Sequence, residues 1–384
     1  MSSLPVATPI AEQYLRLHLC HDVGSIRFAN LLRELGGIDA VLQANVAALS
    51  RVRGVGVPTA ENIKRGRETS ETARQIELAG RCNARILCLE DAEYPPALRG
   101  INDPPACIFV KGSIRPTDAI AFAIVGSRRC TRYGAEQAER FGALLANAGL
   151  TIVSGMARGI DSHGHLGALA AAGRTIAVMG CGLSHLYPPD AAALADRILA
   201  NGAIISELPM DVAPDAKNFP PRNRIIVGMS LGLLVVEAAL RSGALISARL
   251  ALEYNREVFA VPGQIDRPHS AGCHKLIKTS GAKLVTHLDD ILEELGETGA
   301  TLLAQRTEAE PPPVKSERQL ELPDYEATVL RVLESEPISI EVVSEESELP
   351  PGRVASALTG LQLKGLVRCV GGDLYERIRR GQST

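Results

Sequence analysis

The sequence has no tryptophan, and aromatic residues make up only 3% of its 384 positions. We therefore do not expect a binding surface built from many stacked rings. Eight cysteines are present but none forms a Cys-x-x-Cys pair, which argues against a disulfide framework or a zinc site. No apolar run reaches the roughly 18 residues of a membrane span, and no secretory signal pattern opens the chain. We expect a reduced, cytoplasmic protein with no membrane span.

Familiar enzyme motifs are also missing. The Walker pattern GxxxxGK[ST] does not occur, and no GxGxxG follows the first strand of the α/β pattern, which argues against P-loop NTPases and standard dinucleotide-binding dehydrogenases. No Ser-His-Asp or Cys-His set is evident. His163 and His165 lie two positions apart on a predicted helix, so they point in different directions and cannot chelate one metal. We expect core or capping roles for these histidines, and no cofactor and no metal.

The hydrophobic pattern is that of a globular α/β protein. Hydrophobic residues make up 46% of the chain and charged residues 22%, and the length suggests two or three domains. Short apolar runs recur between residues 121 and 263, separated by amphipathic segments: AFAIVG, TIVSG, TIAVMG, AIISE, LLVVEA and EVFAVPG. Such runs predict strands buried on both faces by helices, that is, an extended Rossmann-like core with a doubly wound parallel sheet.

Different patterns flank this core, which we assign to residues 86–295. Residues 1–85 predict short helices and include VRGVGVPTAENIKRG, which resembles a helix-hairpin-helix whose glycine amides can hold a phosphate. The same turn also serves simply to join helices. Residues 296–322 are polar and proline-rich, which predicts a flexible linker.

Residues 323–384 show three helical patterns and then two strands around Gly371-Gly372, which predicts a winged helix. Its predicted recognition helix carries only Arg353 and Lys364, and the segment has more acidic than basic residues. Contact with a protein is therefore a better interpretation than DNA reading.

The predicted strands end in glycine and basic residues. Ligands of open parallel sheets bind beyond the carboxyl ends of the strands. Glycines and cations together suit an extended phosphate chain, although glycines at these ends also make tight turns in any such fold. The residues in question are Ser127, Arg128, Arg129, Gly155, Arg158, Gly159 and Lys217.

One stretch, NFPPRNRIIVGMS at residues 218–230, carries an apparent charge anomaly. Pro220 and Pro221 predict the first turn of a helix. Arg222 and Arg224 then lie near its positive end, where each arginine is unfavourable by about 0.3–1 kcal/mol. A bound phosphate would reverse that sign, so we predict that both arginines bind phosphate and that Phe219 stacks on a base.

Several motifs then support a family resemblance. In order, they are VGSRR, SGMARGID, GCGLSHLYPPD, SELP, FPPRNRIIVGMS, VVEAALRSGALISARLA, REVFAVPGQ and SAGCHKLI. Together they closely resemble the DNA-processing protein A (DprA/Smf) family, and FPxRNRII is the most specific of them. The tail is similar to the winged helix of that family, and the N-terminal helices to its SAM-like or helix-hairpin-helix extension. His274 departs from the usual Asn, and KTSGA is longer than the usual run.

The resemblance implies a function and a site. Members bind single-stranded DNA during natural transformation, protect it and load the RecA recombinase, act as homodimers, and have no established catalytic cofactor. The resemblance therefore implies a non-enzymatic protein. By matching positions, the DNA pocket would use Ser127, Arg128, Ser154, the loop from Ser154 to Gly159, Lys217, Phe219, Arg222, Asn223 and Arg224.

Two other functions remain open at this point. A nucleotide phosphoribohydrolase would use Glu237, near a strand end, as its catalytic acid and the arginines for one 5′-phosphate. Asp161 is a second carboxylate near a strand end, although we expect it to cap its own helix. A transcription regulator would instead read duplex DNA through the winged helix.

Overall fold

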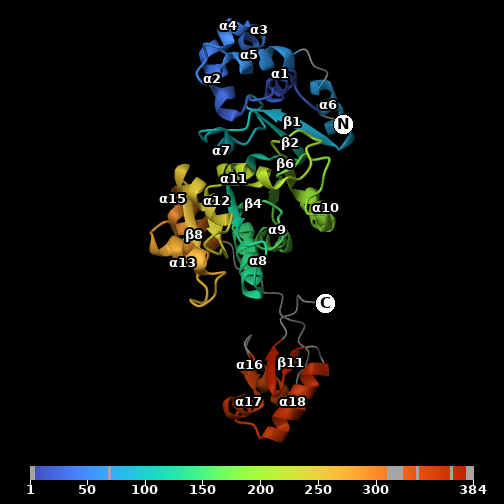
Figure 1. The fold of residues 1–384 in the computed structure, drawn as a ribbon. Helices are drawn as coiled ribbons and strands as arrows, with labels where there is room; N and C mark the ends of the chain where they lie inside the picture. Colours follow the sequence, from blue (N-terminus) through green and yellow to red (C-terminus); the bar gives the residue numbers. More distant parts are fainter. Residues whose placement is uncertain (1–4, 68–70, 309–322, 334–336, 364–365, 378–384) are drawn as a thin grey trace. The chain divides into compact units, whose positions relative to one another are not determined.

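The computed structural model describes residues 5–67, 71–308, 323–333, 337–363 and 366–377 (Figure 1). The chain divides into two compact units, residues 1–308 and residues 309–384. In these described ranges, no helix has both the length and the apolar character needed to cross a bilayer. The same ranges contain no group of three or more His, Cys, Asp or Glu side chains that could hold a metal ion.

Six short helices begin the first unit. Thr8 caps the first of them by accepting a hydrogen bond from the Ala11 amide at 3.1 Å, and Tyr14 and Phe28 pack with ring centroids 5.3 Å apart in the buried core. The Tyr14 hydroxyl donates to Glu90 at 2.9 Å, just beyond the first strand, and so ties the helices to the sheet. The helices are α1 (Pro9–His18), α2 (Ser25–Leu35), α3 (Ile38–Gln43), α4 (Val46–Leu49), α5 (Val57–Gly66) and α6 (Glu71–Arg81).

A nine-stranded sheet forms the centre of the unit. Its order is β1-β2-β6-β5-β4-β3-β7-β8-β9. The pairs β1–β2 and β2–β6 are antiparallel, and all the others are parallel. The strands are β1 (Ala84–Cys88), β2 (Cys107–Gly112), β3 (Ala121–Val125), β4 (Thr151–Ser154), β5 (Thr175–Val178), β6 (Ala203–Ser206), β7 (Gly232–Val235), β8 (Glu257–Ala260) and β9 (Lys283–Leu284). All six strands predicted from the apolar runs are present, which confirms the fold class.

Helices cover both faces of the sheet. Along β3, Phe122 and Ile124 pack into the cluster that contains α8 and α9, whereas Ala123 and Val125 pack into the cluster that contains α11 and α12. This alternation explains why the strand reads as a continuous apolar run. The helices are α7 (Pro96–Arg99), α8 (Arg132–Asn147), α9 (Ile160–Ala170), α10 (Ala192–Asn201), α11 (Phe219–Gly228), α12 (Ala244–Glu253) and α13 (Ala271–Lys278), with 3₁₀ turns η1 (Pro116–Ala119), η2 (Pro189–Ala191) and η3 (Ala216–Asn218).

The linker prediction is wrong for residues 296–308. The segment after α14 (Asp289–Leu292) and the 3₁₀ turn η4 (Glu293–Leu295) continues as the helix α15 (Gly296–Glu308). Leu302 is buried in the same cluster as Phe122, with Leu303 packed against it. The prediction gave too much weight to acidic residues and too little to these two leucines. Residues 309–322 of the predicted linker lie outside the described residues.

The second unit contains a small core under a three-stranded antiparallel sheet with the order β10-β12-β11. Val329, Val343, Leu358 and Val367 are buried between its helices and strands. The elements are α16 (Asp324–Val332), β10 (Ile338–Ser339), α17 (Ile340–Ser347), α18 (Pro351–Leu363), β11 (Val367–Gly371) and β12 (Leu374–Arg377). Three helices followed by a two-stranded hairpin match the predicted winged helix.

Candidate nucleic-acid interface

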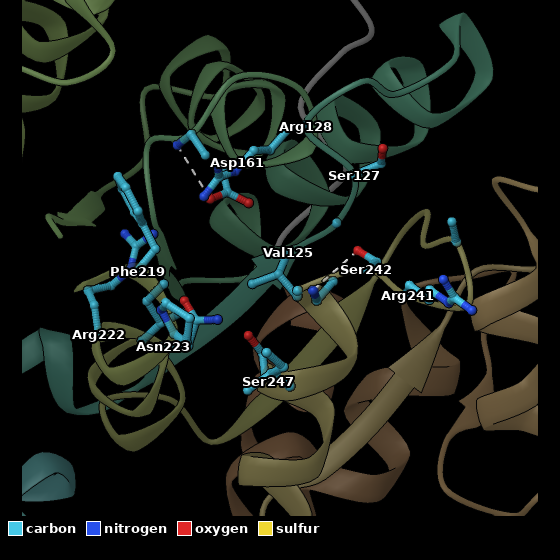
Figure 2. Close-up of a pocket in the computed structure, with 18 of the residues that line it drawn as sticks. Val125, Ser127, Arg128, Asp161, Phe219, Arg222, Asn223, Arg241, Ser242 and Ser247 are labelled. Atoms are coloured by element: carbon cyan, nitrogen blue, oxygen red, sulfur yellow. Dashed lines mark hydrogen bonds between the residues drawn. The ribbon is translucent and has the colours of Figure 1, made fainter. Parts of the chain in front are cut away.

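The strand order reverses at β3. From β3 the chain adds β4, β5 and β6 on one side, and it then returns to place β7 and β8 on the other. The loops that leave β3 and β7 diverge at such a switch point, which is where open α/β sheets bind ligands. A pocket of about 420 Å³ opens there, lined by residues that follow β3, β4 and β7 and by the start of α11 (Figure 2).

The start of α11 is as predicted, with prolines in its first turn. Its Arg222 lines the pocket but is 94% buried, and one of its terminal nitrogens (Nη1) donates to the carbonyls of Gly155, at 2.9 Å, and Val178. Burial lowers the pKa of Arg222 to about 10, and the nearby Asp161 opposes that shift. The charge anomaly is therefore offset inside the protein, by carbonyl oxygens at the ends of β4 and β5 and by one carboxylate.

Gly155 leaves the space that the Arg222 guanidinium fills. A Cβ atom at position 155 would lie 2.4 Å from Nη1 of Arg222, so a larger residue would displace the guanidinium. The Gly155 carbonyl accepts from Arg222, and Ser154 is buried with its hydroxyl donating to the Ile124 carbonyl at 2.6 Å. We predicted Ser154 and Gly155 as DNA contacts, but the structure places both behind the pocket wall.

Arg224 also differs from its prediction. It is buried on another side of α11, where it donates to Glu207 at 2.5 Å and to the Asp103 carbonyl at 2.7 Å. A second ion pair joins its Nε to the Asp103 carboxylate at 3.5 Å. Arg224 does not line the pocket, because two residues along a helix turn a side chain by about 200°. Its contacts anchor α11.

Phe219 is the first residue of α11 and lines the pocket. Its ring packs against Tyr187 with centroids 5.3 Å apart. The Arg128 guanidinium lies over the ring at 4.9 Å from the centroid, and that of Arg222 at 5.8 Å. An aromatic face next to two cations is suited to a base and its phosphate.

The loop after β3 is held tightly from both sides. The Ser127 amide donates to the Glu237 carbonyl at 2.7 Å, and the Ser127 carbonyl accepts from the Ile160 amide at 3.1 Å. Gly159 has a φ of 82°, and a Cβ there would lie 2.3 Å from the Ser127 carbonyl oxygen. Gly159 is thus needed for the close approach of two loops, which positions Ser127 and Arg128 at the pocket.

The other predicted cations lie at the surface outside the pocket lining. Arg129 is exposed and directly follows Arg128. Arg158 pairs with Asp190 at 3.1 Å, and Lys217 pairs with Asp215 at 3.0 Å. Such exposed pairs are weak because water screens them, so they can exchange their partner for a phosphate at little cost. Asn223, in contrast, lines the pocket beside Phe219.

Sequence reasoning missed the pocket wall that follows β7. Arg241, Ser242 and Ser247 line it, at the start of α12, and Figure 2 shows Arg241 and Ser242 across the pocket from Phe219. The available signal was Arg-Ser-Gly in the loop between a strand and a helix, a combination similar to the one that identified the loop after β3. Asp161 is the acidic residue of the lining, and burial raises its pKa. Three arginines therefore face one carboxylate, which favours an anionic ligand.

Comparison with known proteins identifies the family. The family model for DNA recombination-mediator protein A matches residues 85–296, more than half of the chain. The chain belongs to this DprA/Smf family. A second model, for the DprA winged helix domain, matches residues 307–373. The resemblance drawn from the motifs is confirmed.

Individual relatives agree with this assignment. Protein Smf of Escherichia coli (strain K12) is 43% identical over 300 residues, 78% of this chain and 78% of that protein. The X-ray structure of DprA from Streptococcus pneumoniae has a TM-score of 0.65 at 33% identity, covering 73% of this chain and 97% of that one. A Helicobacter pylori DprA structure, described as showing a single-stranded DNA binding mode of that protein, has a TM-score of 0.50 at 30% identity, covering 58% and 96%.

The phosphoribohydrolase hypothesis requires Glu237 as a catalytic acid, but in this DprA/Smf family member the Glu237 carboxylate is engaged in hydrogen bonds within the protein. Glu237 is buried, and its oxygens accept from the Thr131 amide at 2.8 Å and the Thr131 hydroxyl at 2.6 Å. Thr131 in turn caps α8 by accepting from the Gly134 amide at 3.2 Å. Glu237 does not line the pocket. It holds the start of α8, and the structure gives no support to a role as catalytic acid.

The two histidines have separate environments. His163 pairs with Glu139 at 2.7 Å on the surface, whereas His165 is fully buried with its Nδ1 2.6 Å from the Thr175 hydroxyl. Burial, with a smaller contribution from Arg222, lowers the pKa of His165 to about 3. His165 is thus a neutral core residue.

This burial predicts an acid sensitivity. The pKa of His165 is lower in the folded than in the unfolded chain. The contribution of the neutral His165 side chain to the free energy of unfolding is therefore complete above the unfolded pKa near 6.5 and is lost as pH falls towards 3. Between pH 7 and pH 5 the free energy of unfolding should fall by about 2 kcal/mol more in the wild type than in His165→Asn. Urea unfolding at both pH values measures this difference, and equal losses in the two proteins would contradict it.

Proposed function

We propose that this protein binds single-stranded DNA in the pocket between β3 and β7. The observation that carries the proposal is that Phe219, Arg128 and Arg241 line one pocket of about 420 Å³. Two exposed arginines at its mouth can meet phosphates, while the ring and the apolar wall can receive a base. The described binding mode of the H. pylori relative supports the same ligand class.

The cations outside the pocket extend this interface. Arg129, Arg158 and Lys217 lie on the loops that frame the pocket, so a strand that leaves the pocket can run along them. With Arg128 and Arg241, they provide about four to six phosphate contacts, which is typical of a groove that follows the backbone. Arg222 and Arg224 are not part of this set, because both are buried.

A salt titration tests the proposal. Four to six phosphate contacts to a single strand predict that the logarithm of the association constant falls with the logarithm of salt concentration with a slope of about −3 to −4. Fluorescence anisotropy of labelled oligo-dT with the full-length protein measures this slope. A slope near zero would exclude phosphate contacts as the basis of binding.

The biological role that we propose follows the family. The protein would protect incoming single strands in the cytoplasm and load the RecA recombinase on them during natural transformation, acting as a homodimer without a catalytic step. RecA filament assembly on DNA coated with single-strand binding protein tests the loading step. No acceleration by the full-length protein would contradict it, and a single protomer mass in light scattering would contradict the dimer.

We also propose that the segments of the chain have different roles. Residues 86–308 would form the DNA-binding core, residues 1–85 a helical extension, and the winged helix of residues 323–384 a surface for a protein partner. In the described part of the winged-helix unit, the helix α17 carries Glu341, Glu345 and Glu346, and Glu348 directly follows it. These acidic residues favour a protein partner over DNA. A chain ending at residue 308 should keep its affinity for oligo-dT, whereas a transcription regulator would lose DNA binding.

A further inference from the structure

The N-terminal helices contain two turns with the same backbone geometry. Gly24 caps α2 with φ −81° and ψ 172°, and Gly56 caps α5 with φ −82° and ψ 171°. A buried valine precedes each glycine, and a residue with positive φ precedes each valine: Asp22 at 67° and Gly54 at 83°. The amides of Val23 and Val55 each donate to the carbonyl three residues earlier, at 3.2 and 3.0 Å. Each turn joins two helices, so the segment contains two helix-hairpin-helix units.

The two hairpins contact each other reciprocally. Arg27, on the helix that follows the first turn, donates to the Gly54 carbonyl of the second turn at 2.8 Å. Asn62, on the helix that follows the second turn, donates to the Asp22 carboxylate of the first turn at 3.4 Å. Arg27 also donates to the Asp22 carbonyl at 2.6 Å and so bridges the two turns. The hairpins therefore lie side by side.

Charge distinguishes the two turns. The first has Asp22 where the second has Gly54, and its carboxylate would repel a phosphate. The second turn follows Arg51 and Arg53, whose side chains have no acceptor within hydrogen-bonding or ion-pair distance among the described residues. Other arginines of these helices are paired: Arg16 with Glu12 and Arg81 with Glu77.

The backbone of the second turn is fixed and its outer donors are available. The Arg53 amide donates to Glu34 at 3.2 Å, and the Arg53 carbonyl accepts from Asn30 at 3.1 Å. In the described part of the chain, the Gly54 and Gly56 amides have no hydrogen-bond acceptor. Val57, directly after the turn, is 55% exposed. A rigid turn that presents amides, two cations and an aliphatic side chain matches the phosphate and sugar of one backbone unit.

We propose that the second hairpin, residues 50–57, is a second DNA-binding site that holds the sugar–phosphate backbone independently of the pocket between β3 and β7. Gly54 and Gly56 donate their amides to one phosphate, and Arg51 and Arg53 neutralise it and its neighbour. The first hairpin supports the second through Arg27 and Asn62. The backbone can belong to a duplex or to a longer single strand, because the recognised chemistry is the same.

A matched pair of double variants tests this site in the full-length protein. Arg51→Ala/Arg53→Ala removes two cations of the hairpin, and Arg16→Ala/Arg81→Ala removes two elsewhere on the same helices. The probes are a blunt 20-base-pair duplex, a 20-nucleotide oligo-dT and a 6-nucleotide oligo-dT. For the wild type, the control and the hairpin variant, anisotropy is measured across salt concentrations. Unchanged thermal unfolding confirms that each variant is folded.

The hairpin variant should bind the duplex about 10-fold more weakly than the control variant, with a salt slope smaller by about 2. Weaker binding of the 20-nucleotide strand with unchanged duplex binding would also support the site and would identify a single strand as its ligand. Equal affinities and slopes of the two variants for both long probes would overturn the proposal. Binding of the 6-nucleotide strand by the wild type reports on the pocket alone. If the wild type failed to bind this strand, the result would count against the pocket and not against the hairpin.

Discussion

Replacing Arg224 with alanine is expected to lower the free energy of unfolding by about 3 kcal/mol. The guanidinium is 90% buried and joins α11 to Glu207 and to Asp103. Its removal leaves the Glu207 carboxylate, itself only 19% exposed, without its ion-pair partner. Removing one member of such a pair is costly because the remaining charge stays poorly solvated. Urea unfolding of the full-length protein measures the loss.

Arg249→Ala is the control for this prediction. Arg249 lies exposed on α12 and forms no hydrogen bond or ion pair with the described residues, so its replacement should change stability by less than about 0.5 kcal/mol. At a temperature where Arg224→Ala stays folded, its salt slope for oligo-dT should equal that of the wild type. A stable Arg224→Ala protein with a reduced slope would instead restore the original prediction that Arg224 binds phosphate.

Replacing Phe219 with alanine is expected to weaken binding of oligo-dT by about 10- to 100-fold, because stacking on one aromatic ring contributes about 1–3 kcal/mol per base. Phe219→Leu keeps the apolar volume but removes the ring, so its loss should be nearly as large. Arg128→Ala should also weaken binding and should reduce the salt slope by about 0.7. Anisotropy titrations at two salt concentrations measure both effects.

The neighbouring arginine provides the matched control. Arg128 and Arg129 are both exposed, but only Arg128 lines the pocket and lies over the Phe219 ring. Arg129→Ala should therefore cost only a small loss, about 2- to 3-fold, from a peripheral phosphate contact. Equal losses for Arg128→Ala and Arg129→Ala would show that general charge, and not the pocket, holds the strand.

The fold could be predicted from the sequence because its strands are buried on both faces. Six apolar runs such as AFAIVG mark six parallel strands, and the helical and winged-helix segments follow from equally local patterns. The edge strands β1 and β9 were missed. β9 has only two residues, and β1 alternates less clearly because Arg85 is part of it. Short or mixed strands depend on pairing that a local pattern does not contain.

The candidate site could be predicted only by region. Glycine and arginine after β3 correctly indicated the carboxyl ends of the strands, but not which side chains point into the pocket. Arg222 and Arg224 read alike in the sequence, yet one borders the pocket and the other is anchored to Glu207. The roles of Gly155 and Ser154 depend on Arg222 and Ile124, far away in the chain. Contacts of that kind appear only when the strands are placed together.

Photocrosslinking can locate a bound single strand directly. Full-length protein irradiated with oligo-dT that carries 5-iododeoxyuridine, then mapped by mass spectrometry, should be labelled at Phe219 and in the segments 125–128 and 239–247 that line the pocket. Phe219→Ala should remove most of this labelling. Crosslinks confined to the winged-helix unit, with none in those segments, would contradict the assignment of the pocket between β3 and β7 as the binding site for single-stranded DNA.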